Sequence, residues 1–116
     1  GGNLALATVL NKSSDAKADY LGLFYPSVSD AFLDADLKAS DVPPVFVMNA
    51  FDDPKTPVDR CLMLYTALQK AGIRSELHIF GRGNHGFDLG YGKGHAVAGW
   101  PQAFLAWLKD ENILTD

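Results

Sequence analysis

Two loops of this sequence carry polar side chains that could act together as an acid and a base. Asp52-Asp53 follow the apolar run Val45–Met48, and Asn84-His85-Gly86 follow the partly alternating run Glu76–Phe80. In open sheets of parallel strands, functional groups lie in the loops beyond the carboxyl ends of the strands. An aspartate and a histidine placed there can form a hydrogen bond that fixes the imidazole tautomer and leaves the other ring nitrogen as a general base. The pattern therefore predicts acid–base chemistry at this edge.

The sequence shows no motif for a nucleophile, a metal or a phosphate. No serine lies in a G-x-S-x-G turn, and Cys61 falls on the apolar face of a predicted helix, so we expect it to be inert packing. The three histidines lack the H-E-x-x-H spacing of a zinc site. Six of the 11 glycines fall between Gly81 and Gly94, without the G-x-G-x-x-G pattern or the Lys-Ser/Thr pair of a phosphate loop. We therefore expect neither a metal nor a cofactor.

Short apolar runs alternate with helical patterns along the chain, which predicts an α/β protein with a parallel sheet. Three strands are expected, at Tyr20–Tyr25, Val45–Met48 and Glu76–Phe80. Helices are expected at Leu4–Leu10, from Thr56 to Ala71-Gly72, and from Trp100-Pro101 onwards, with one short helical turn around Ala31–Leu37.

The second of these helices has the clearest signals. Thr56 can be its N-cap, with Pro57 at the first position and Asp59 completing a capping-box-like pair, and Gly72 gives a glycine stop. Its apolar face is expected to contain Val58, Cys61, Leu62, Tyr65 and Leu68. The apolar face of the last helix is expected to contain Phe104, Leu105, Trp107 and Leu108.

Length and composition limit the possible functions. A chain of 116 residues fits one domain or a piece of one, and 47% apolar and 21% charged residues are ordinary for a globular protein. The net charge of -4 argues against a nucleic-acid partner, because such proteins usually carry a basic surplus. No apolar run approaches the roughly 20 residues of a membrane helix, so we expect no membrane partner. A single cysteine excludes a disulfide within the chain.

Two features predict that a preceding part of the domain is missing. The chain lacks an initial Met and passes from Gly1-Gly2-Asn3 directly into an apolar helix, although Gly-Gly is also a common cloning remnant. In addition, three parallel strands make a thin sheet, and parallel strands are normally paired and covered on both faces. A neighbouring part of the same protein would supply that pairing.

Four segments resemble the α/β-hydrolase superfamily. Gly1–Ala5 resembles the stretch after the nucleophile, in the pattern G-x-S-A-G-G-x-L-A, and Pro43–Val58 resembles the penultimate strand with its acid loop, H-G-x-x-D-x-x-V-P. Gly83–Phe87 resembles the G-x-H-G-F of the catalytic histidine, and Trp100–Leu108 resembles the closing helix. The resemblance covers nearly the whole chain and is strongest to the acetyl esterase and acetylxylan esterase-like branch, carbohydrate esterases of the same general group as feruloyl esterases.

The resemblance implies roles for two residues. It makes Asp53 the catalytic acid, with Asp52 as a solvated neighbour, and His85 the catalytic histidine, whereas the serine would lie two residues before Gly1. The sequence departs from the pattern at Asn49-Ala50, which replace His-Gly, and at Thr56, which replaces Val. Residues 1–116 would then form a single partial α/β-hydrolase domain: the C-terminal portion of the sheet, without the nucleophile elbow.

The other histidines and aromatic residues have plainer interpretations. His78 lies inside a predicted strand, which favours a structural role, and His95 lies in the glycine-rich loop, which favours the surface. Tyr91 and Trp100 could stack on a sugar, but such residues are at least as often packing.

On this resemblance the intact protein is a serine-type carboxylic ester hydrolase acting on acetylated sugars or small acyl esters, with no cofactor. Its partners would be the ester substrate and the missing N-terminal part, and the isolated chain would be inactive. Two alternatives remain open. A serine peptidase of the prolyl-oligopeptidase type shares the acid and histidine motifs, and a non-catalytic interaction module could keep this half-sheet.

Overall fold

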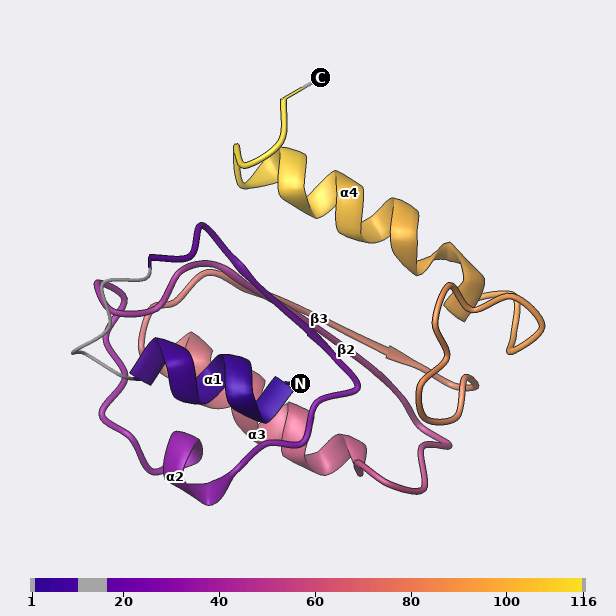
Figure 1. Cartoon of the computed structure of the whole chain (residues 1–116), viewed down its shortest axis with the longest axis horizontal. Helices are drawn as coiled ribbons and strands as arrows, with labels where there is room; N and C mark the ends of the chain where they lie inside the picture. The colour runs from indigo at the N-terminus through magenta and orange to yellow at the C-terminus, as the bar shows by residue number, and fades with distance from the viewer. Residues whose placement is uncertain (1, 11–16, 116) are drawn as a thin grey trace.

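The computed structural model describes residues 2–10 and 17–115 and shows a parallel sheet with helices on both faces (Figure 1). The strands lie in the order β1-β2-β3. The elements in chain order are α1 (Gly2–Leu10), β1 (Leu21–Phe24), α2 (Asp30–Leu33), β2 (Val45–Ala50), α3 (Val58–Lys70), β3 (Ser75–Phe80), the 3-10 turn η1 (Val97–Gly99) and α4 (Trp100–Asp110). The predicted fold class, three parallel strands with flanking helices, is confirmed, although Gly1 lies outside the described residues.

The central strand β2 is buried along its whole length because helices cover both faces of the sheet. Val45 and Val47 pack in a core with residues of α1 and α3, whereas Phe46 and Met48 pack in a second core with Trp107 of α4. Alternate residues of a strand point to opposite faces, so a strand between two helical layers buries both sets of side chains, and apolar residues are favoured at nearly every position. This explains why the run is continuously apolar in the sequence.

The register of the sheet brings the ends of the strands to one edge. Phe24 of β1 pairs with Met48 of β2, and Met48 pairs with His78 of β3. Ala50 and Phe80 form the last pair of β2 and β3. The loops that follow β2 and β3 therefore leave the sheet side by side, as the sequence predicted.

The beginning of α3 differs from the prediction. Pro57, not Thr56, is the N-cap residue, and no side chain caps the helix. The Thr56 hydroxyl instead donates a hydrogen bond to the Asp53 carboxylate. A preceding carboxylate within reach competes for the hydroxyl, so the local capping pattern did not predict the outcome.

The apolar faces of α3 and α4 were each predicted with one wrong member. The buried residues of α3 are Cys61, Leu64 and Leu68, whereas Leu62 is 51% exposed. In α4, Trp107 and Leu108 are buried but Leu105 is 49% exposed. Positions 61, 64 and 68 form one stripe on a helix of 3.6 residues per turn, and position 62 is turned about 100° away from position 61.

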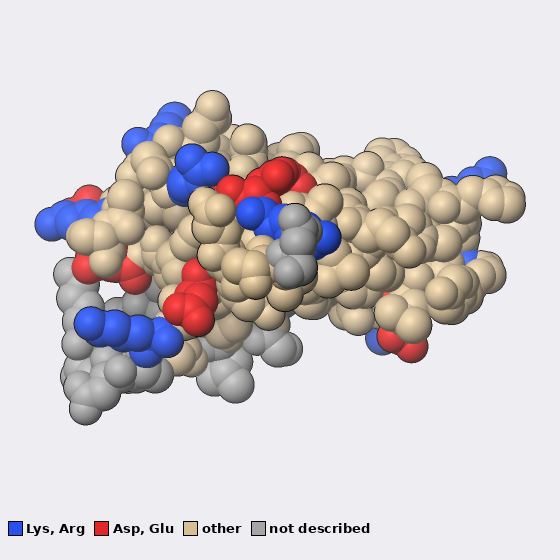
Figure 2. All heavy atoms as spheres, turned by 90° about the horizontal axis from the view of Figure 1, so that it is seen from above, with Lys and Arg blue, Asp and Glu red and all other residues tan. Residues whose placement is uncertain are grey.

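The surface carries charges of both signs. On the face seen in Figure 2, which includes the side of α4, acidic and basic side chains lie next to each other over one half, and uncharged residues fill much of the other half. Among the described helices, none has both the length and the apolar character needed to cross a membrane.

Candidate active site

Asp53 lies in the loop between β2 and α3, and its side chain stabilises the turn of that loop. Its Oδ1 accepts hydrogen bonds from the backbone N–H groups of Lys55 and Thr56, at 2.7 and 2.9 Å. Its backbone N–H donates to the carbonyl of Ala50 at the end of β2. Aspartate favours such turns because its carboxylate can bond to the backbone two or three residues ahead. The turn leaves the second carboxylate oxygen free for other partners.

The second oxygen of Asp53 faces the histidine loop. Oδ2 lies 2.8 Å from His85 Nδ1 and accepts a hydrogen bond from the Thr56 hydroxyl at 2.6 Å. Burial by itself raises the pKa of Asp53, but the hydrogen bonds from Thr56, His85 and Lys55 outweigh burial and hold the pKa below its ordinary value. The carboxylate is therefore ionised at neutral pH and can only accept, so the proton on Nδ1 of His85 points towards it.

This arrangement leaves the other ring nitrogen of His85 available. When Nδ1 carries the proton of the neutral ring, Nε2 has a free lone pair and can accept a proton from a substrate or nucleophile. The Asp53 side chain is fully buried and the His85 side chain is 28% exposed. The pair predicted from the sequence is thus brought together across 32 residues of chain, with the acid inside and the base at the surface.

Asp52 holds the histidine loop from the same side. Its Oδ1 accepts a hydrogen bond from the Asn84 backbone N–H at 2.7 Å, and the Asn84 side chain in turn accepts from the His85 backbone N–H at 2.8 Å. Asn84 has a positive φ of 61°, a conformation that asparagine tolerates better than most residues. Asp52 is exposed, as expected, but it also links the acid loop to the histidine loop.

Asn49 is a residue of the site that the sequence reasoning did not assign. It is completely buried in β2, where its Nδ2 donates to the Thr56 carbonyl at 2.7 Å and its Oδ1 accepts from the Ala50 N–H at 2.8 Å. A buried amide must find such partners, because an unpaired polar group inside the protein is costly. Asn49 therefore ties both ends of the acid loop together. A single polar residue within an otherwise apolar strand was the signal for it.

A hollow of about 390 Å³ opens beside His85. Residues from several segments line it, namely Gly2, Ala5, Gly22, Phe24, Tyr25, Ser27, Thr56 and His85. The rings of Tyr25 and His85 meet edge to face, with centroids 5.1 Å apart. Tyr25 has a positive φ of 41°, so the chain bends sharply where β1 ends. The exposed edge of His85 and the start of α1 therefore share one cavity.

The remaining residues noted in the sequence lie outside this hollow. Cys61 is buried, and burial raises the pKa of its thiol, in agreement with the expected inert packing. His78 lies within β3, 2.7 Å from Glu76 and against Phe46. Trp100 packs on Phe24 and donates its indole N–H to the Asp88 carbonyl.

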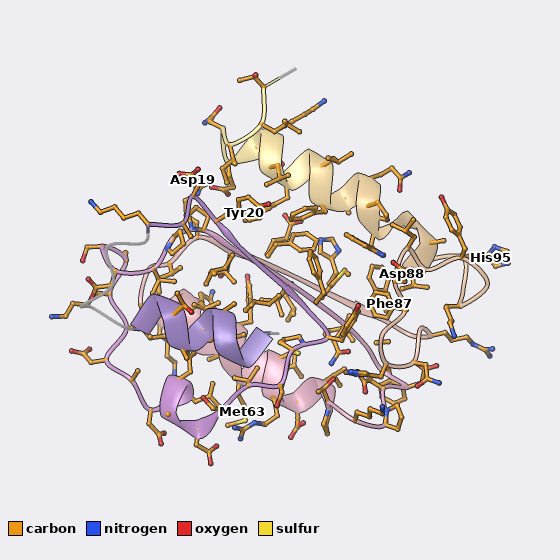
Figure 3. The ribbon with its side chains drawn as sticks, in the orientation of Figure 1. Asp19, Tyr20, Met63, Phe87, Asp88 and His95 are labelled. Atoms are coloured by element: carbon orange, nitrogen blue, oxygen red, sulfur yellow. The ribbon has the colours of Figure 1, made fainter. Side chains whose placement is uncertain are left out.

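His95 and Tyr91 line a second hollow of about 690 Å³ together with Arg82 and Lys93. Figure 3 shows His95 at the outer end of the glycine-rich loop, away from Phe87. Neither ring lines the cavity beside His85. Within residues 2–10 and 17–115, no group of three or more His, Cys, Asp or Glu side chains could hold a metal ion.

Helices on both faces of a parallel sheet, with an acid and a histidine in loops at its carboxyl edge, define part of an α/β-hydrolase fold. The sequence model of the prolyl oligopeptidase family matches residues 16–112, so the chain belongs to that family. A search of curated protein sequences found no significant match.

Solved structures share this fold. An acetyl ester-xyloside bifunctional hydrolase from Caldicellulosiruptor lactoaceticus is 22% identical, with a TM-score of 0.79 over 98% of this chain and 54% of its own. An α/β hydrolase from a Medee basin deep-sea metagenome library is 27% identical, with a TM-score of 0.78 over 98% of this chain and 52% of its own. A carboxylesterase from Lactobacillus plantarum is 21% identical, with a TM-score of 0.74 over 90% of this chain and 49% of its own. The chain thus spans about half the length of these proteins.

Proposed function

We propose that the intact protein is a serine-type carboxylic ester hydrolase in which Asp53 and His85 are two members of a catalytic triad. The observation that carries this proposal is the buried carboxylate of Asp53, 2.8 Å from Nδ1 of a partly exposed imidazole. The third member would be a serine two residues before Gly1. This serine is expected to lie near the cavity, because Gly2 at the start of α1 lines the same hollow as His85.

The chemistry follows from the arrangement of the pair. The serine oxygen attacks the acyl carbon while Nε2 of His85 takes the hydroxyl proton, and Asp53 stabilises the imidazolium without becoming protonated. The ester C–O bond then breaks, and His85 returns the proton to the leaving alcohol. Water repeats these steps on the acyl-enzyme and releases the acid. The backbone N–H of the residue after the serine, which would directly precede Gly1, would be one of the donors to the oxyanion.

The proposed substrates are acetylated sugars or other small acyl esters. Support comes from the names of the similar structures, which include an acetyl ester-xyloside hydrolase and a carboxylesterase. A cavity with aromatic walls, here Phe24 and Tyr25, is a suitable surface for an acylated sugar ring. The protein needs no cofactor for this reaction.

The first experiment establishes what precedes Gly1. The intact mass and a peptide map that covers the residues before Gly1 in the natural protein should reveal a serine two residues upstream. Hydrolysis of p-nitrophenyl acetate and acetylated xylo-oligosaccharides is then measured for the wild type and for His85→Ala, which should lower kcat by at least about 10³-fold. His95→Ala is the matched control, because His95 lines the second hollow, which shares no residue with the cavity beside His85. An upstream sequence without a nucleophile, or a His85→Ala variant as active as the control, would contradict the proposal.

The family match favours one alternative, a serine peptidase of the prolyl-oligopeptidase type. It would use the same pair of residues on an amide bond instead of an ester. Cleavage of a prolyl p-nitroanilide peptide by the intact protein, without cleavage of acetyl esters, would replace the esterase proposal with this one. An additional N-terminal domain in the intact sequence would point in the same direction.

A further inference from the structure

The Thr56 hydroxyl lies between the two proposed catalytic side chains. Its Oγ1 is 2.6 Å from Oδ2 of Asp53 and 3.2 Å from Nδ1 of His85. The third neighbour, the Tyr25 carbonyl, is more distant at 3.4 Å. A hydroxyl has one proton to donate, and a carboxylate at short distance is the stronger acceptor. The proton therefore points to Asp53, and the oxygen lone pairs face the N–H of His85.

Thr56 is itself held firmly by its backbone. Its N–H donates to Oδ1 of Asp53 at 2.9 Å, and its carbonyl accepts from the buried amide of Asn49 at 2.7 Å. The residue also precedes Pro57, whose ring restricts the conformation of the residue before it. A hydroxyl fixed in this way needs little reorganisation to hold its partners, which is the property required of a group that orients a catalytic base.

We propose that Thr56 is a positioning residue, whose hydroxyl directs Oδ2 of Asp53 towards His85 and restricts rotation of the imidazole. This inference rests on the proposed function, because it assigns Thr56 a task within the same triad. Two oxygens, Oδ2 and Oγ1, then surround the Nδ1 proton, so the ring keeps that tautomer and Nε2 remains the basic nitrogen of a residue that lines the cavity. Thr56 touches neither the attacking nor the leaving atom and acts only through Asp53 and His85.

Removal of the Thr56 hydroxyl should loosen the contact between Asp53 and His85 without changing the shape of the cavity that Thr56 lines. Thr56→Val keeps the shape of the side chain but removes the three contacts of Oγ1, with Asp53, His85 and the Tyr25 carbonyl. The Asp53 carboxylate then loses a donor, so the pKa of Asp53 should rise. His85 should populate the Nε2–H tautomer more than in the wild type, because one of the two oxygens around the Nδ1 proton is removed. In the esterase assay kcat should fall roughly tenfold, equivalent to ~1.4 kcal/mol on the barrier, with KM nearly unchanged. Thr56→Ser retains the hydroxyl and should keep most of the wild-type kcat and the wild-type tautomer of His85.

The test uses the intact protein that carries these residues, with ¹⁵N-labelled histidine and ¹³C-labelled aspartate. NMR reports the tautomer of His85 and the titration of Asp53 in the wild type, Thr56→Val and Thr56→Ser. Thr66→Val is the matched control, because Thr66 lies exposed on α3 and its hydroxyl donates a hydrogen bond to the Leu62 carbonyl in the same helix. If Thr56→Val does not fold, Thr56→Ala takes its place in the same comparison.

The proposal and the proposed function can fail separately. An unchanged His85 tautomer and Asp53 titration in the folded Thr56→Val protein would overturn the role of Thr56, even if the wild type hydrolyses esters. The same holds if Thr56→Ser behaves like Thr56→Val. A tautomer shift that serine reverses would support the positioning role, even in a protein that proves to cleave amides instead of esters.

Discussion

Replacement of Asp53 by asparagine tests the site most directly. The carboxylate accepts hydrogen bonds from four donors, which are the backbone N–H groups of Lys55 and Thr56, the Thr56 hydroxyl and Nδ1 of His85. An amide has only one acceptor oxygen, and it would stay with the two backbone donors of the turn. Its NH₂ group would then face the Thr56 hydroxyl and His85, which are both donors in the wild type.

The two donors can respond differently. The Thr56 hydroxyl can rotate and accept from the new NH₂ group, whereas His85 must move its proton to Nε2 so that Nδ1 can accept. In that tautomer Nε2 is no longer a base, and kcat should fall about 10⁴-fold, the effect of this exchange in a serine triad. The loss of one charged hydrogen bond should lower the free energy of unfolding by about 1.5–3 kcal/mol.

The assay pairs ester hydrolysis with urea unfolding of the same samples. Asp36→Asn is the control, because it makes the same change of charge at an exposed position between α2 and β2. The control should match the wild type in both measurements. A folded Asp53→Asn protein that keeps kcat within tenfold of the wild type would refute the assignment of tautomer and acid.

Three further outcomes are expected. Because the folded-state pKa of Asp53 is lowered, its contribution to stability is fully present above the unfolded pKa of about 3.9 and is lost as the pH falls through the folded value. Urea midpoints should therefore fall less on acidification in Asp53→Asn than in the wild type, and parallel curves would contradict this. Gly83→Ala places a Cβ 3.0 Å from the Cβ of Ala50 and should lower the free energy of unfolding by about 1–3 kcal/mol. In Gly81→Ala the new Cβ meets no atom within 4 Å, so the loss should be much smaller. Equal losses in a denaturant titration would refute the crowding at Gly83. Cys61 should react with a thiol reagent only after unfolding, since its side chain is buried and the pKa of its thiol is raised. Rapid labelling of the native protein would show that this face of α3 is not buried.

Local patterns predicted the elements of this fold well. The continuous apolar run of β2 indicated a strand covered on both faces, and helices do cover both. Two of the predicted helix ends also agree with the structure, because α3 ends at Lys70 before Gly72 and α4 begins at Trp100-Pro101. Such signals depend on residues within one turn of helix or one strand, so a single sequence contains them.

The errors came from competition between local and distant partners. Thr56 fits the pattern of a helix cap, but its hydroxyl bonds to Asp53 and approaches His85, which is 29 residues away. Leu62 and Leu64 are both apolar and close to the same stripe, and only the position of the sheet decides that Leu64 is buried and Leu62 exposed. Periodicity predicts how far apart the buried residues of a helix are in the sequence, but tertiary contacts decide which side of the helix is buried.

The sequence by itself determined the fold class and the order of the acid and histidine loops, because these depend on residue types along a short stretch of chain. Only the tertiary structure decided that the Thr56 hydroxyl lies between Asp53 and His85 and that Asn49 ties the acid loop to β2. These contacts join residues on different elements, and they depend on the parallel register that aligns the ends of β2 and β3. A hydrogen bond tolerates only a few tenths of an ångström, and this accuracy arises when the packed sheet fixes both loops.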